Sequence, residues 1–208
     1  MSRLLIEIAR RRQRPGSGSI PCGPEPVSFT MDFRTLLSVP FTIIGGQATK
    51  AYMPPRNTLD WGLLVHADDL AQARSDLERA GAHSFAALTI PGFSCRLATG
   101  DALDVIASDA PWLATALARP NHDQSGQPIL ALPFLVLMKL TSARVQDLAD
   151  VSRMLACAAP AAVADCRTTI AAHLPDALDD LQSLLDLGRL ERSPSPHSAP
   201  PPHGGSPC

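Results

Sequence analysis

GGQATKAYMPPRNTLDWGLLV, residues 45–65, is the stretch of sequence that decides the fold. Before it, the run Phe-Thr-Ile-Ile at residues 41–44 predicts a short buried strand that stops at Gly45-Gly46. A short helix is expected over residues 47–52, ended by Pro54-Pro55, and the apolar residues 63–65 predict a second strand. The stretch therefore predicts two strands joined by a short helix and a loop.

The chain after residue 65 continues to alternate between helical and strand patterns. A helix is expected over residues 68–81, because apolar residues recur there at three- and four-residue spacing and a glycine ends the pattern. Three strands are expected next, at residues 84–89, 93–98 and 102–107. Helices are then expected at residues 111–117, 133–141, 145–158, 160–173 and 175–190. The predicted fold class is α/β (α+β), a mixed β-sheet flanked by helices and followed by a helical C-terminal portion.

The domain organisation follows from length and composition. At 208 residues the chain suits one core rather than two large ones. Residues 1–30 and 193–208 are rich in Pro, Ser and Gly or in Arg, and are expected to be a disordered extension and a disordered tail. Between them, residues 31–131 are expected to form the α/β core and residues 132–192 the helical portion of the same domain.

Composition excludes few classes of function. The formal net charge is -2 and aromatic residues make up 4%, so nothing indicates a nucleic-acid surface. The longest apolar run, residues 129–138, contains Pro133 and is about half the length of a membrane helix, so no membrane partner is expected. The five cysteines include no C-x-x-C pair and are expected to be reduced and structural, which suits the cytoplasm.

Three features carry the chemistry: Gly45-Gly46 after a strand, Asp60 before the next strand, and Asp104 within a later strand. A Gly-Gly pair at a strand end is most often only a turn. Asp104 is more unusual, because it stands among Leu103, Val105 and Ile106. Burying a carboxylate costs several kcal/mol unless a partner or a cation compensates it, so either a structural salt bridge or a metal ion is expected there.

The order of these features resembles the signature of the nucleotidyltransferase superfamily, in the branch that includes bacterial abortive-infection toxins. That signature has a strand ending in Gly-Gly or Gly-Ser, a short helix, an Arg-x-Thr-x-Asp-x-Asp stretch and a further carboxylate on a later strand. A second match, Leu-x-x-Lys followed by Arg-x-x-Asp-x-x-Asp, covers residues 137–150. The residues that match the two patterns are Gly45, Gly46, Arg56, Thr58, Asp60, Asp104, Lys139, Arg144, Asp147 and Asp150.

The resemblance implies transfer of a nucleoside monophosphate from a nucleoside triphosphate (NTP) to a hydroxyl group on protein or RNA. Asp60 and Asp104 would bind Mg²⁺ or Mn²⁺ and serve as the catalytic carboxylates. The resemblance also implies a cognate toxin or antitoxin partner. It assigns contacts with the nucleotide to Gly45, Gly46, Arg56, Thr58 and Lys139.

One position departs from the family pattern, because Gly62 stands where the second Asp of Asp-x-Asp is expected. Residues 60 and 62 point to the same side of a strand, so the glycine removes a ligand from the expected metal site. The alternative is a catalytically inactive pseudoenzyme that binds nucleotide or protein. In a third alternative, Asp60 and Asp104 only pair with Arg56 and Lys139. For Asp147 and Asp150, a charge network on the surface of a helix is the competing explanation.

Overall fold

The computed structural model describes residues 29, 31–54, 58 and 60–192. Within them a single sheet of seven strands has the order β3-β4-β5-β2-β1-β7-β6. The strands are β1 (Phe41–Ile44), β2 (Trp61–His66), β3 (His83–Ala87), β4 (Gly92–Arg96), β5 (Ala102–Ser108), β6 (Asn121–His122) and β7 (Pro128–Ile129). The helices are α2 (Gly45–Thr49), α3 (Leu70–Arg79), α4 (Leu113–Ala118), α5 (Leu132–Ser142), α6 (Val145–Cys157), α7 (Pro160–His173) and α8 (Leu178–Arg192). Three short 3₁₀ turns complete the elements: η1 (Phe33–Thr35), η2 (Ala67–Asp69) and η3 (Pro175–Ala177).

The sheet is mixed, which confirms the predicted α/β class. β2 pairs with β1 in antiparallel and with β5 in parallel orientation, and β4 pairs with β5 in antiparallel orientation. The segment between β2 and β5 contains α3 and the β3–β4 hairpin, as a parallel pair requires a long connection. The predicted strands and helices are all present, with ends shifted by a few residues. Among the strands, only β6 and β7, of two residues each, were not expected, and the 3₁₀ turn η1 was not expected either.

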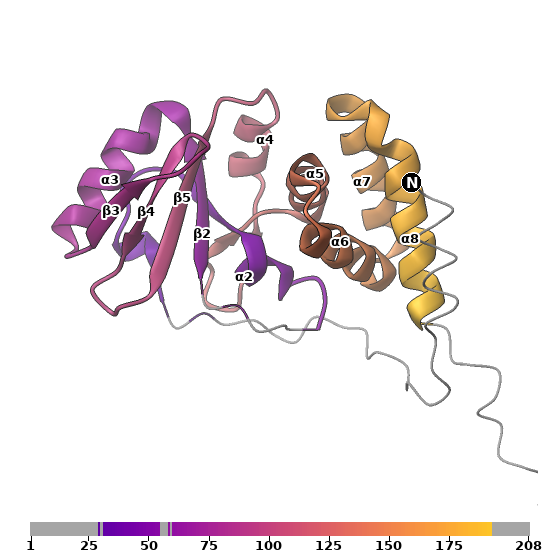
Figure 1. Cartoon of the computed structure of the whole chain (residues 1–208), viewed down its shortest axis with the longest axis horizontal. Helices are drawn as coiled ribbons and strands as arrows, with labels where there is room; N and C mark the ends of the chain where they lie inside the picture. Colours follow the sequence, from indigo (N-terminus) through magenta and orange to yellow (C-terminus); the bar gives the residue numbers. More distant parts are fainter. Residues whose placement is uncertain (1–28, 30, 55–57, 59, 193–208) are drawn as a thin grey trace, which may run out of the picture.

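One face of the central strands is fully buried. β5 alternates between buried and half-buried residues, and Leu103 and Val105 on its buried side are fully inaccessible to solvent. Helix α3 covers this face, because the guanidinium of Arg74 lies over the rings of Phe85 and Phe93. Figure 1 shows the sheet between α3 on one side and α5–α8 on the other. Buried side chains from the sheet and from these four helices form one hydrophobic cluster.

The thiols were all expected to be reduced, and this is correct for two of the three cysteines that the structure describes. Cys95 and Cys166 are free and buried. Burial raises the pKa of Cys95 to about 11 and that of Cys166 to about 12, so neither is a nucleophile at neutral pH. Cys157, in contrast, forms a disulfide. Over the described ranges, no helix has the length and apolar character needed to span a bilayer.

The buried carboxylate of Asp76 anchors α3 to the segment before β1. It accepts hydrogen bonds from the backbone N–H of Ser38 at 2.7 Å and from the Ser38 hydroxyl at 2.6 Å, and a third from Gln72 at 2.7 Å. The bonds from Ser38 hold the pKa of Asp76 below its usual value. A carboxyl with a lowered folded-state pKa stabilises the protein above its unfolded-state pKa, and this contribution is lost as the pH falls through the folded-state pKa.

We expect Asp76→Asn to lower the free energy of unfolding at neutral pH by about 1–3 kcal/mol, because a charged acceptor of buried hydrogen bonds is lost. The difference between wild type and variant should shrink as the pH falls below about 4. Denaturant unfolding between neutral and acid pH measures both effects. Asp109→Asn, at an exposed position, is the matched control. A difference that stays constant with pH would contradict the prediction.

Candidate functional site

The structure brings Asp104 and its neighbours together in a row across four strands. In the strand register, Ile44 of β1 is opposite Gly62 of β2, Gly62 is opposite Asp104 of β5, and Asp104 is opposite Ser94 of β4. Residues directly opposite one another in a sheet point to the same face. This is the face opposite α3, and on it Gly62, Ser94 and Asp104 are half-buried. The row therefore lies where a ligand can reach the sheet.

Asp60 completes the row from the end of β2. It lies one residue before the strand and two before Gly62, so the alternation of side chains places it on the Asp104 side. Asp60 is exposed. Burial raises the pKa of Asp104, and the charge of nearby Asp60 raises it further. The two carboxylates thus share one small region of negative charge.

Among the described residues, neither carboxylate has a compensating partner. Across the residues that the structure describes, no hydrogen bond and no ion pair reaches the side chain of Asp60 or Asp104. The same residues contain no group of three or more His, Cys, Asp or Glu side chains that could hold a metal ion. The site is therefore a pair of carboxylates. A half-buried carboxylate without a partner, next to a second one, is a place where a cation is electrostatically favoured.

Gly45 and Gly46 at the end of β1 were expected to contact the nucleotide, and only part of their geometry fits that role. Gly45 has a φ of +68°, and a side chain added there would meet no atom within 4 Å. The position therefore needs glycine for its backbone conformation and leaves open space above it. Gly46 accepts a hydrogen bond from the hydroxyl of Thr49 at 2.7 Å, which closes the first turn of α2.

The loop residues of the expected signature are partly visible. Thr58 is half-buried, and its carbonyl accepts a hydrogen bond from Gln47 at 3.4 Å, so Thr58 is tied to α2. Arg56, expected to contact the nucleotide, lies outside the described residues. Pairing of Asp60 with Arg56 is therefore not described by the structure.

Lys139 lies in a buried ion cluster between α5 and α6. Its Nζ donates to Asp147 at 2.7 Å and to Asp150 at 2.8 Å. The side chains of Lys139 and Asp147 are 5% and 6% exposed, and that of Asp150 is 0% exposed. Burial acts to raise the pKa of Asp147, but hydrogen bonds from Lys139, Ser142 and Arg144 outweigh it and lower the pKa. A charge network on a helix surface was one of the two explanations considered for these aspartates, and it is wrong, because both are buried around the lysine.

Ser94 is the member of the row that the sequence did not indicate. Its register with Asp104 depends on the loop of residues 97–101 between β4 and β5. The turn dipeptide Gly100-Asp101 marks that loop, but the loop length that sets the register is not visible in the sequence.

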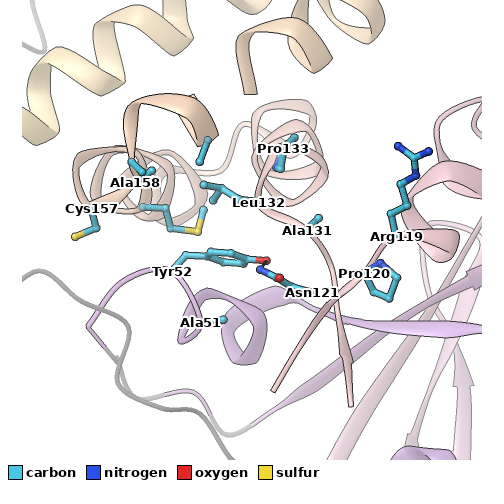
Figure 2. A pocket seen from close by; sticks show the side chains of 13 residues that line it. Ala51, Tyr52, Arg119, Pro120, Asn121, Ala131, Leu132, Pro133, Cys157 and Ala158 are labelled. Carbon is cyan, nitrogen blue, oxygen red and sulfur yellow. Dashed lines mark hydrogen bonds between the residues drawn. The ribbon is translucent and has the colours of Figure 1, made fainter. Parts of the chain in front are cut away.

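A separate cavity of about 340 Å³ lies beside the turn after α2, next to the starts of α5 and α7 (Figure 2). Tyr52 projects into it, donates a hydrogen bond to the carbonyl of Leu130 at 2.8 Å and accepts one from Asn121 at 3.0 Å. Burial raises the pKa of Tyr52 to about 12. No residue of the carboxylate row lines this cavity, so we do not assign it to the site.

Fold and site together define the class of protein: a mixed α/β chain with a pair of carboxylates that has no partner among the described residues, on the face of the sheet opposite α3. No protein-family model and no curated protein matches the sequence.

Among solved structures, two of the aminoglycoside nucleotidyltransferase ANT(2'')-Ia are similar to this chain. One is a solution structure of this antibiotic-resistance factor, with 13% identity, 70% of this chain and 80% of that chain covered, and a TM-score of 0.41. The other is a crystal structure in complex with adenylyl-2''-tobramycin, with 14% identity, 74% and 90% covered, and a TM-score of 0.39. Similarity of this size does not assign a function.

Proposed function

We propose that this chain is a nucleotidyltransferase-like protein that transfers a nucleoside monophosphate from an NTP to a hydroxyl group on protein or RNA. The observation that carries the proposal is the half-buried carboxylate of Asp104, which lies beside Asp60 and has no partner among the described residues. The sequence signature around both residues supports it. We expect the protein to act in the cytoplasm, and its assignment to the abortive-infection branch is part of the same proposal.

The residues of the row fit a divalent cation. Two carboxylates supply hard oxygen ligands, and the cation would neutralise the charge that they now share without a partner. Asp60 and Asp104 would hold Mg²⁺ or Mn²⁺. Bound there, the ion would supply a Lewis acid that stabilises negative charge on the transferred phosphoryl group.

Other residues of the chain are proposed to contact the NTP. Gly45 and Gly46 leave the backbone at the end of β1 open to a phosphate, since the space at Gly45 is free. Arg56 and Thr58 belong to the loop that leads to Asp60 and are proposed to bind the triphosphate. The contact with the nucleotide that the resemblance implies for Lys139 is left out of the proposal, because its ammonium is buried and already binds two aspartates.

We expect Asp60→Ala to abolish transfer of label from α-labelled NTPs to RNA or protein, with a loss of about a hundredfold or more, because a metal ligand is removed. Each of the four NTPs is tested with Mg²⁺ and with Mn²⁺, using total RNA and a protein extract as acceptors. Asp109→Ala is the control, because Asp109 is exposed. Equal labelling by wild type and Asp60→Ala would show that the activity does not use this site.

The second candidate function is a pseudoenzyme that binds nucleotide or a protein partner such as a cognate toxin or antitoxin. The observation that favours it is Gly62, which contributes no ligand to the row. A wild-type chain that binds an NTP in calorimetry but transfers no label with any acceptor supports this candidate against the first.

A further inference from the structure

Ile44 covers the position at which a further carboxylate would enter the row. It lies directly opposite Gly62 in the β1–β2 register and is 3% exposed. A Cβ atom at residue 62 would lie 3.1 Å from Cγ1 of Ile44. This is closer than ordinary van der Waals contact, so the isoleucine would have to move.

The backbone does not explain the glycine. Gly62 is absent from the glycines with positive φ, which are Gly45, Gly81, Gly92, Gly100 and Gly126. Any residue can adopt its conformation, so what a side chain would meet there is the buried side chain of Ile44. The pair Ile44–Gly62 is therefore a packing unit in which the larger side chain fills the space of the smaller one.

We infer that the Ile44–Gly62 pair closes the place of a further metal ligand, so that the site holds one divalent cation, between Asp60 and Asp104. The inference rests on the proposed function, because that function identifies the ligand as a divalent cation. Two carboxylates carry two negative charges, which a single divalent ion balances. A second ion would bring an excess of positive charge, and the described residues offer no third acidic, cysteine or histidine ligand for it.

The Ile44–Gly62 pair also affects a substitution that would restore the missing carboxylate at residue 62. Gly62→Asp alone places a Cβ 3.1 Å from Cγ1 of Ile44, so the buried isoleucine has to shift by a few tenths of an ångström. The new carboxylate is then held away from the position that the metal needs. Shortening Ile44 to alanine removes Cγ1 and opens that position, so the two substitutions should act together.

The experiment is a titration of the full chain with Mn²⁺. Binding is measured by isothermal calorimetry and by the electron paramagnetic resonance signal of free Mn²⁺. Wild type should bind one equivalent, and Asp104→Asn should weaken binding about tenfold or more. Gly62→Asp and Ile44→Ala should each stay within about threefold of wild type. The double variant Ile44→Ala/Gly62→Asp should bind about tenfold more tightly than either.

Three results would overturn the inference. Two equivalents bound by wild type would contradict the single cation, and no Mn²⁺ binding would contradict the cation site. Binding by Gly62→Asp as tight as that of the double variant would show that Ile44 closes nothing. Failure of label transfer alongside the expected Mn²⁺ results would instead leave this inference in place and remove only the proposed activity.

A matched series with alanine at residue 62 tests the packing pair without any new charge. Gly62→Ala should lower Tm by about 2–4 °C when residue 44 is isoleucine, and by clearly less when it is alanine. Thermal unfolding of wild type, the two single variants and the double variant measures the difference. Additive shifts would overturn the pairing of the two residues even if Gly62→Asp fails to fold.

Discussion

Lys139→Met is expected to lower the free energy of unfolding by about 3–5 kcal/mol, because it leaves Asp147 and Asp150 buried without their shared ammonium group. Methionine keeps most of the volume of the lysine side chain, so the loss reports charge rather than a cavity. Asp147 keeps its bonds to Ser142 and Arg144, which sets the effect below that of an isolated buried charge. Denaturant unfolding followed by circular dichroism measures the change.

The pH dependence and a rescue variant distinguish this cause from general damage. In wild type the lowered pKa of Asp147 means that its contribution is present above the unfolded-state pKa and is lost as the pH falls. In Lys139→Met the two carboxylates have lost the ammonium group and should take up protons more readily, so the deficit should shrink in acid. Adding Asp147→Asn and Asp150→Asn should recover much of the stability at neutral pH.

Arg144→Met is the control for the same cluster. The Arg144 side chain is 78% exposed, so its ion pair with Asp147 is expected to contribute less than about 1 kcal/mol. A Lys139→Met variant no less stable than Arg144→Met would refute the assignment of a buried ion cluster.

Gly188→Ala is expected to destabilise the protein by about 1–3 kcal/mol, although alanine has the higher helix propensity by about 1 kcal/mol. Gly188 lies in α8 where the helix touches α6. A Cβ there would lie 2.2 Å from the carbonyl oxygen of Ser152 and 2.8 Å from Cβ of Ala156. Backbone atoms cannot turn away as a flexible side chain can, so α6 and α8 must separate.

The direction of the change in stability distinguishes helix propensity from helix packing as its cause, and thermal unfolding measures this change. Propensity alone predicts that Gly188→Ala stabilises, whereas the contact between the two helices predicts that it destabilises. Glu191→Ala, at an exposed position of the same helix, should change stability by less than about 0.5 kcal/mol. A more stable Gly188→Ala protein would show that α8 does not pack on α6 through this glycine.

The order and type of the long elements could be predicted because each follows from a local pattern. β5 alternates buried and half-buried residues, and α7 begins at Pro160 and ends at His173 as its pattern predicts. β6 and β7 could not be predicted, because two residues carry no periodicity. They exist as strands because β7 pairs with β1 and β6 with β7, and these are contacts between segments far apart in the chain.

The same distinction between local patterns and tertiary contacts applies to the candidate site. The sequence by itself determined the strand that carries Asp104 and the strand that follows Asp60, and it determined that Gly62 offers no ligand, since residue type and alternation are local properties. Only the tertiary structure decided that Ile44 covers Gly62 and that Lys139 is buried. The physical reason is that strand register and helix packing are set by side chains that meet across the fold, and neither is written in the spacing of residues along one segment.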